Sequence, residues 1–159
     1  MASATALAAP AESTYRVSVN APSHDGVVSQ IFILTALTGD QNKPLIFNRR
    51  RTKTGFIKDC NLAPSFKVTT DMVTTGTEVG IVVDEDQSDP EAMAVNVSIN
   101  HSVLTKMDSV QLNKGGCKIQ VPVVNSSSVN QAVNLKIGER VQLINDGHLG
   151  IEWSIERIQ

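Results

Sequence analysis

Residues 117–146 read CKIQVPVVNSSSVNQAVNLKIGERVQLIND, and this stretch decides the fold class. Apolar and polar residues alternate on both sides of a serine cluster, and the chain turns at Ile137–Glu139. Alternation with a period of two turns one face of a strand toward a core and the other toward water. We therefore predict consecutive antiparallel strands whose inward residues are Ile119, Val121, Val123, Val133, Leu135, Ile137, Val141 and Leu143.

The same period of two recurs along the rest of the chain. It predicts strands with the inward residues Tyr15, Val17, Val19, Val79, Ile81, Val83, Val95, Val97, Ile99, Ile151, Trp153 and Ile155. We interpret residues 28–37 as a strand because β-branched and aromatic residues dominate there, whereas residues 101–112 fit a helical turn, a strand or a bent connection. The predicted fold class is all-β, an antiparallel sandwich or open sheet of about 7–9 short strands with at most one short helix.

The length of 159 residues is typical of one domain with its own core. We expect a flexible leader at residues 1–13 and a single all-β domain at residues 14–159. The leader is rich in alanine and ends like a secretory signal, but it has no basic segment and no long apolar segment. A trimmed mature chain is the alternative. The net charge of −2 gives the whole protein no electrostatic preference for nucleic acid or an anionic membrane.

The two cysteines, Cys60 and Cys117, lie far apart in the sequence and outside any Cys-x-x-Cys motif. A zinc site or a thioredoxin-like redox motif is therefore unsupported. In a chain rich in Ser, Thr and Asn, the pair fits one disulfide, and the alternative is two buried free thiols. We favour the disulfide, and with it an extracytoplasmic location, periplasmic or secreted, over a cytoplasmic one.

The densest basic segment is NRRRTKTGFIKD at residues 48–59. Its basic residues are Arg49, Arg50, Arg51, Lys53 and Lys58. Such a cluster can bind an anionic partner, and the alternative is a solvated loop or strand edge on which charge deters edge-to-edge pairing. Pro122 lies within a strong strand pattern, so that strand is expected at a sheet edge or with a bulge. We predict both the cluster and the edge at Pro122 as partner-binding regions.

The remaining polar clusters give no clear catalytic or metal-binding pattern. Residues 84–91, DEDQSDPE, carry five carboxylates, which could hold calcium but depart from the EF-hand spacing; a polar hairpin tip is the other interpretation. The three histidines share no metal-ligand spacing, and no nucleophile elbow or phosphate-binding loop occurs. We expect no enzyme activity, no metal and no cofactor.

Three segments resemble the β-domain core of bacterial secretins, the outer-membrane channels of secretion and pilus systems. FILTALTGDQNKPLIF (32–47) is similar to a strand, turn and strand of that family. TEVGIVVDEDQSDPEAMAVNVSINHSVL (77–104) is similar to a strand, an acidic tip and a return strand. IQVPVVNSSSVNQAVNLKIGERVQLIND (119–146) is similar to the segment with a Pro-Val motif and a Lys-x-Gly-Glu-x-Val turn. The chain departs from the family at residues 144–150, where INDGHLG replaces the expected Gly-Gly pair.

The resemblance implies a part in a secretion or pilus-type assembly. From all these patterns we expect a non-enzymatic extracytoplasmic structural or interaction domain that binds a protein partner or a second copy. The alternatives are a monomeric binding module, such as an adhesin, pilin-like subunit or inhibitor, and a virion or assembly subunit that packs by sheet contacts. The net charge disfavours nucleic acid, although residues 49–58 leave it open. Membrane contact is expected only if the chain is part of a larger assembly, because a barrel needs aromatic girdles and the chain has one Trp, one Tyr and four Phe.

Overall fold

The computed structural model describes residues 12–23, 26–37, 42–85, 89, 91–112, 117–144 and 150–159. In these ranges the chain forms eight strands in two four-stranded antiparallel sheets, which confirms the all-β prediction. None of these residues is helical, so the described part has no helix that could cross a membrane. The first strand starts at Glu12, two residues before the predicted start of the domain at residue 14, and residues 1–11 lie outside the described ranges.

The first sheet has the strand order β2-β1-β8-β7 and the second has the order β3-β4-β5-β6. The strands of the first sheet are β1 (Glu12–Ser23), β2 (Gly26–Leu37), β7 (Arg140–Leu143) and β8 (Glu152–Arg157). Those of the second are β3 (Ile46–Asn61), β4 (Lys67–Glu85), β5 (Met93–Gln111) and β6 (Lys118–Leu135). The predicted number of strands is therefore correct. The second sheet, however, is built from strands of 16 to 19 residues, which are not short.

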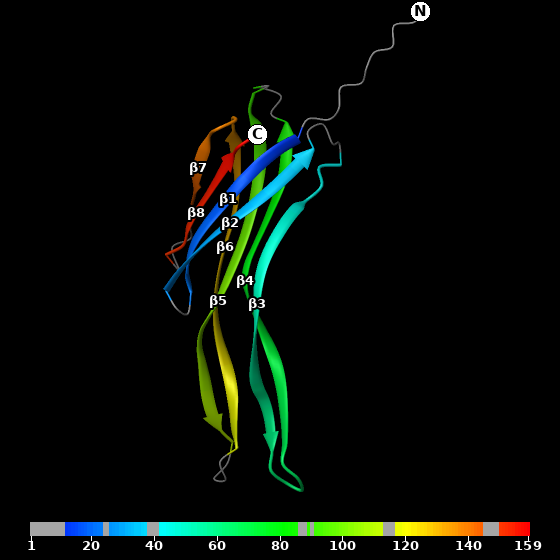
Figure 1. Cartoon of the computed structure of the whole chain (residues 1–159), viewed down its shortest axis with the longest axis vertical. Helices are drawn as coiled ribbons and strands as arrows, with labels where there is room; N and C mark the ends of the chain where they lie inside the picture. Colours follow the sequence, from blue (N-terminus) through cyan, green and yellow to red (C-terminus); the bar gives the residue numbers. More distant parts are fainter. Residues whose placement is uncertain are drawn as a thin grey trace, which may run out of the picture.

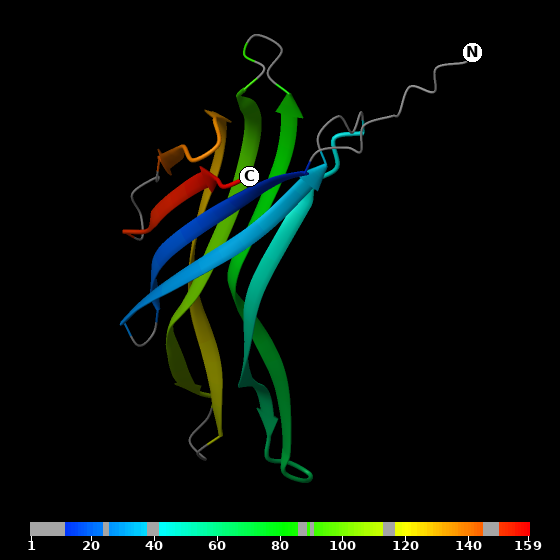
Figure 2. The ribbon, with the colours of Figure 1, turned by 45° about the horizontal axis from the view of Figure 1, so that its top comes forward.

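The core lies where the first sheet crosses one half of the second sheet diagonally (Figures 1 and 2). Alternate side chains of both sheets meet there, as the period of two predicted. Tyr15, Val17, Val95 and Trp153 are fully buried. β2 adds Phe32, Leu34 and Ala36 to the buried apolar residues, while its other face is exposed. This half of the molecule, which we call the body, is a β-sandwich closed around one apolar cluster.

The other half of the second sheet extends beyond the body as two long hairpins (Figures 1 and 2). β4 pairs with β5 from Glu85–Met93 to Gly76–Ser102, and past that point each strand keeps its hairpin partner alone. We call the two hairpin segments, residues 52–75 and 103–125, the arm, and the point where β4 and β5 separate, the fork. The long strands are therefore shared between a packed body and a projecting arm.

The arm explains where the predicted core is wrong. Ile119, Val121 and Val123 alternate as a core strand should, but they lie in the arm and are half-buried or exposed because no second sheet covers them. Ile137 is 66% exposed because it lies in the turn after β6, beyond the last buried residue of that strand. The pattern thus identified the strand faces correctly, but not the length over which the first sheet covers them.

Candidate functional site

The fork depends on a glycine with an unusual backbone conformation. Gly76 has φ +135°, and a Cβ there would collide with the carbonyl oxygen of Arg50 on the paired strand β3. Its N–H donates to the Ser102 hydroxyl, 3.2 Å away, across the last paired position of β4 and β5. A residue with positive φ and no side chain lets two backbones approach closely and lets the sheet twist open at this point.

Two contacts hold the hairpins of the arm together. Cys60, at the end of β3, forms a disulfide with Cys117, just before β6, and their Cα atoms are 6.1 Å apart. The Ile57 backbone N–H donates to the Gln120 side-chain oxygen at 2.9 Å. A two-stranded hairpin buries too little apolar surface to be stable alone, and in the described arm Cys117 is the one fully buried side chain. The disulfide therefore braces an element that has almost no core.

The predicted basic cluster lies on a strand and is not a loop. Residues 49–58 belong to β3, the edge strand of the second sheet. Successive side chains of a strand point to opposite faces, so Arg50 lies on the other face from Arg49, Arg51 and Lys53. Lys58 sits at a β-bulge, where the pairing with β4 shifts between Ile57 and Asp59. The structure thus divides the five basic residues and does not bring them together as one patch.

Three of these basic side chains have partners on other strands. Arg50 donates to the Ile31 carbonyl oxygen at 3.0 Å, and its guanidinium lies 5.3 Å from the centre of the Phe32 ring, so it joins the two sheets. Arg51 pairs with Glu78 at 2.7 Å, and Lys58 pairs with Asp71 at 3.3 Å. These contacts favour a structural role for three of the five basic residues. The Arg49 guanidinium lies 5.9 Å from the centre of the Phe47 ring on the same strand.

Pro122 lies in the arm part of β6, opposite Met107 of β5. β6 is an edge strand, as the proline predicted, and a shift in the β5–β6 pairing lies nearby, between Leu104 and Lys106. However, the side of β6 away from β5 faces the other hairpin, which the Gln120 contact and the disulfide draw toward it. The edge at Pro122 is therefore partly covered by the arm itself.

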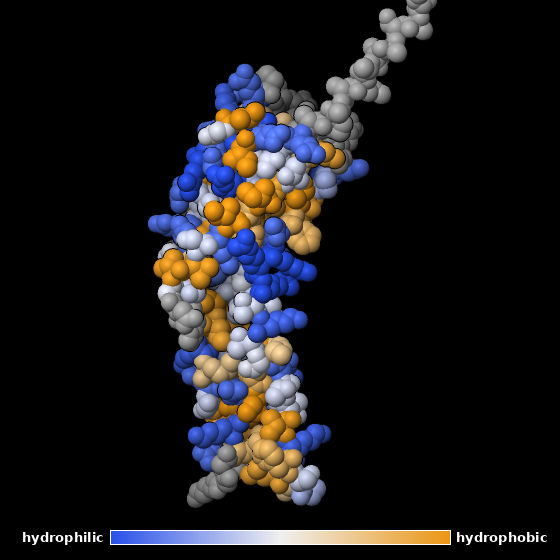
Figure 3. Space-filling view, viewed as in Figure 1, coloured by the Kyte–Doolittle hydropathy of each residue, from blue (hydrophilic) through white to orange (hydrophobic). Residues whose placement is uncertain are grey.

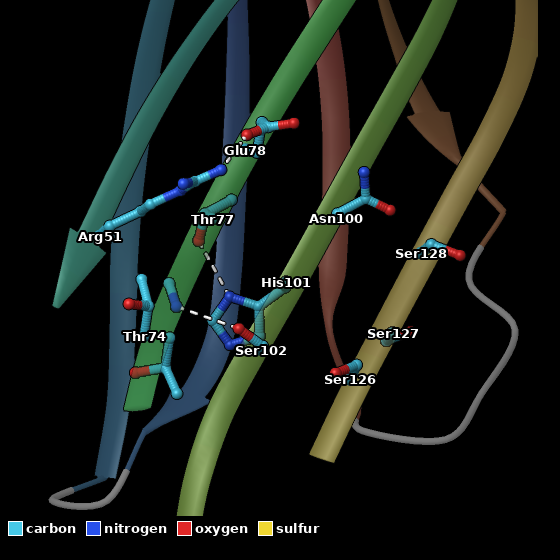
Figure 4. A pocket seen from close by; sticks show the side chains of 12 residues that line it. Arg51, Thr74, Thr77, Glu78, Asn100, His101, Ser102, Ser126, Ser127 and Ser128 are labelled. Atoms are coloured by element: carbon cyan, nitrogen blue, oxygen red, sulfur yellow. Dashed lines mark hydrogen bonds and ion pairs between the residues drawn. The ribbon is translucent and has the colours of Figure 1, made fainter. Parts of the chain in front are cut away.

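A polar cleft of about 570 Å³ opens at the fork (Figure 4). Hydroxyl, amide and charged side chains from β3, β4, β5 and β6 line it, among them Arg51, Thr77, Glu78, Asn100, His101 and Ser126. The buried pair Thr77 and His101 joins β4 to β5 through a 2.9 Å contact between Oγ1 and Nδ1. The charges of Arg51 and Glu78 compensate each other. The lining can therefore exchange hydrogen bonds with a polar group, but it carries no excess charge to attract an ion.

The arm has two strand edges without a neighbouring strand. Beyond the fork, residues 67–75 of β4 pair with β3 and residues 103–111 of β5 pair with β6, and the other side of each segment pairs with no described strand. On β4, the Met72 N–H donates to the Asp71 carboxylate at 2.8 Å. This hydrogen bond, followed by the Lys58 ammonium group, lowers the pKa of Asp71. Within the described residues no side chain bonds to the outer edge of β5, so residues 103–111 form the open edge.

Exposed apolar side chains gather toward the end of the arm (Figure 3). Phe66 is 70% exposed and Met72 is 62% exposed; Val110, Leu112 and Val121 are exposed to a smaller extent. Apolar surface gathered on a projecting element is typical of a contact site for another molecule. The arm therefore combines unpaired backbone groups with apolar side chains.

Comparisons with known proteins add no relative. No family model, no curated protein and no solved structure matches this chain. The resemblance to secretins therefore stays a prediction from the three sequence segments. Within the described ranges, no three His, Cys, Asp or Glu side chains are grouped so that they could hold a metal ion. Of the acidic segment 84–91, residues 86–88 and 90 lie outside the described ranges, between β4 and β5.

Sequence reasoning missed the open edge. Residues 101–112 were compatible with three structures, because Lys106 and Asp108 interrupt the apolar pattern. In the structure the segment is the second half of β5, and the two charged side chains form an ion pair of 2.9 Å on one face. A useful signal was the absence of Gly and Pro between Met93 and Gln111, which allows one uninterrupted strand.

Proposed function

We propose that this chain is a non-enzymatic structural or interaction protein of an oxidising extracytoplasmic compartment, periplasmic or secreted. In this proposal it binds a protein partner or a second copy by strand pairing at the open edge of β5, residues 103–111. The observation that carries the proposal is this edge, which has unpaired backbone groups on a braced element outside the body. Edges of this kind bind extended segments through main-chain hydrogen bonds.

The disulfide brace supports the proposed location. The Cys60–Cys117 disulfide joins the ends of two hairpins that share little buried surface, so the arm depends on an oxidised cysteine pair. Disulfides of this structural kind persist in secreted and periplasmic proteins and are rare in the cytosol. A part in a secretion or pilus-type assembly, which the resemblance to secretins implies, is the more specific form of the same proposal.

Hydrogen exchange of individual amides tests whether the edge is available. Adjacent residues of a regular strand direct their N–H groups to opposite sides, so in the dilute protein every second amide between 106 and 111, beyond the shift in the β5–β6 pairing, should exchange fast. The amides between them, bonded to β6, should exchange slowly. The paired body segment of β5, residues 93–101, is the internal control and should be protected throughout. Uniform protection of residues 103–111 in the dilute protein would show that the edge is covered and would refute the proposal.

The cleft at the fork supports a second candidate, a monomeric binding module. Its volume and hydroxyl-rich lining suit a small polar ligand more than a protein strand. The two functions are separable, because Asn100→Ala changes the cleft lining in the body part of β5 and leaves the open edge intact. If association survives this substitution, the edge acts without the cleft.

A further inference from the structure

We infer that the partner strand is the same edge of a second copy, so that two chains pair antiparallel through β5 about a two-fold axis at Met107. This inference rests on the proposed function and names the partner of that site. The open edge runs from Val103 to Gln111, because Ser102 is the last residue of β5 that pairs with β4. Met107 lies between Lys106 and Asp108, so antiparallel pairing of two such edges centred there sets each charged side chain opposite its counter-charge.

Antiparallel pairing about Met107 brings opposite charges together. Lys106 of each copy lies opposite Asp108 of the other, and the ion pair forms twice. The pairing of β5 with β6 shifts between Leu104 and Lys106, so the regular part of the open edge starts at Lys106 and includes both charged residues. Cross-strand pairs of opposite charge stabilise an antiparallel sheet. The register centred at Met107 is thus one with matched charges.

The other free edge of the arm lacks this complementarity. Residues 67–75 of β4 are centred on Asp71, so complete overlap would place two carboxylates opposite each other. Like charges directly opposite destabilise a sheet. In addition, the Met72 N–H is already bonded to the Asp71 carboxylate. The β4 edge is therefore protected against self-pairing in two ways that the β5 edge is not.

The architecture leaves room for a second copy. In both ribbon views the arm part of β5 lies on the outer side of the arm, away from the β3–β4 hairpin (Figures 1 and 2). The disulfide and the Gln120 contact lie on the opposite side of the β5–β6 hairpin and would not be disturbed. Pairing would join two hairpins into one four-stranded sheet with the order β6-β5-β5-β6. Each copy would use the same surface, so the contact closes as a dimer.

The ion pair within one chain sets the expected strength of the charge effect. Lys106 and Asp108 side chains are 61% and 47% exposed, so each single pair contributes little. When the two edges pair, the two separate ion pairs become one group of four charges that alternate in sign. Reversing one charge in each copy converts two cross-strand attractions into two repulsions. We therefore expect the dimer dissociation constant to rise by about tenfold or more in either single variant.

Mixing two charge variants tests the inference. Lys106→Asp leaves two carboxylates on each edge, and Asp108→Lys leaves two ammonium groups. Each variant alone should be monomeric at a concentration at which the wild type is dimeric. An equimolar mixture should form the heterodimer, measured by native mass spectrometry. Repair of a contact within one chain cannot produce this result, because each chain in the mixture keeps its own like-charged pair.

A matched pair on β4 serves as the control. Lys58→Asp and Asp71→Lys change an exposed ion pair of the same arm without touching the β5 edge, and both variants should dimerise like the wild type. Fluorescence of the single, buried Trp153 verifies that every variant retains its body. If the wild type is monomeric at every concentration, or if the mixture stays monomeric while the wild type dimerises, the inference fails. If both charge variants dimerise like the wild type, but a proline that blocks the edge abolishes dimerisation, this register is refuted and the proposed function stands.

Discussion

At the scale of single residues, Gly76 permits the fork, and the titration of Tyr15 depends on its burial in the body. Gly76 combines positive φ with close contact to the Arg50 carbonyl, so both the backbone conformation and the space around it exclude a side chain. Tyr15 is the single tyrosine of the chain and is fully buried in the body. A conservative substitution at each of these residues tests its structural role.

Gly76→Ala should lower the free energy of unfolding by more than about 1 kcal/mol, because the new side chain meets strain and a collision at once. Gly55→Ala is the matched control in the same hairpin. A Cβ there would meet the Met72 sulfur at 3.6 Å, which is an ordinary contact. We expect this control to change stability little. Equal stability of the two variants in urea unfolding would contradict the account of the fork.

The Tyr15 phenol should titrate at unusually high pH. Burial raises the pKa of Tyr15 above its ordinary value of 10.0, while the nearby Ser13 hydroxyl and the Arg157 charge lower it by less. Above pH 10.0 the unfolded chain loses this proton and the native chain keeps it, so stability should fall as the pH rises further. Phenolate absorbance measures the titration directly, and Tyr15→Phe should flatten this part of the stability profile. An unshifted absorbance titration in the folded protein would be inconsistent with a buried phenol.

At the scale of elements, the arm is the part of the fold that depends on covalent bracing. Its hairpins have half-buried apolar side chains such as Phe56, Ile57 and Met107, but no second sheet covers them. The body has a core between two sheets and requires no such brace. Loss of the disulfide should therefore act on the arm before it acts on the body.

Cys60→Ser combined with Cys117→Ser should lower the free energy of unfolding by on the order of 4 kcal/mol, the chain-entropy value for cysteines 57 residues apart. Amide exchange in residues 52–75 and 103–125 should accelerate, whereas Trp153 fluorescence should stay native. The intact wild-type protein should be two hydrogen atoms lighter than its reduced form. Labelling of both cysteines by a thiol reagent without prior reduction would remove the basis of this prediction.

The sequence predicted the faces of the strands better than their roles. Val17, Val95 and Trp153 were assigned to the core from their alternation, and they are buried. Val121 alternates equally well but lies in the arm, because the pattern records which way a side chain points and not what covers it. The order of the strands in the two sheets could not be predicted from the sequence either, since β1 pairs with β8 across almost the whole chain length. The basic cluster was visible as composition, but its division between two faces required the strand register.

At the scale of the whole molecule, the body supports an arm whose open edge we propose as the binding site for another strand. Arg50 ties the two sheets of the body together next to the fork, through Ile31 and Phe32. The Thr77–His101 contact joins β4 to β5 immediately before they separate. These contacts fix the base of the arm, and the disulfide fixes its end. A projecting element held at both ends can present a strand edge in one orientation, which strand pairing requires.

The native mass of the protein, measured by light scattering over a range of concentrations, tests this account most directly. The native mass of the wild type should rise from 17.1 kDa toward twice that value as the protein concentration increases. Ser109→Pro and Val110→Pro remove adjacent N–H groups, so one of them blocks the open edge and the other weakens the ladder with β6. The edge variant should stay monomeric with an unchanged melting temperature. A wild type of 17.1 kDa at every concentration, or dimers that persist in both proline variants, would contradict the claim that the arm associates through the open edge of β5.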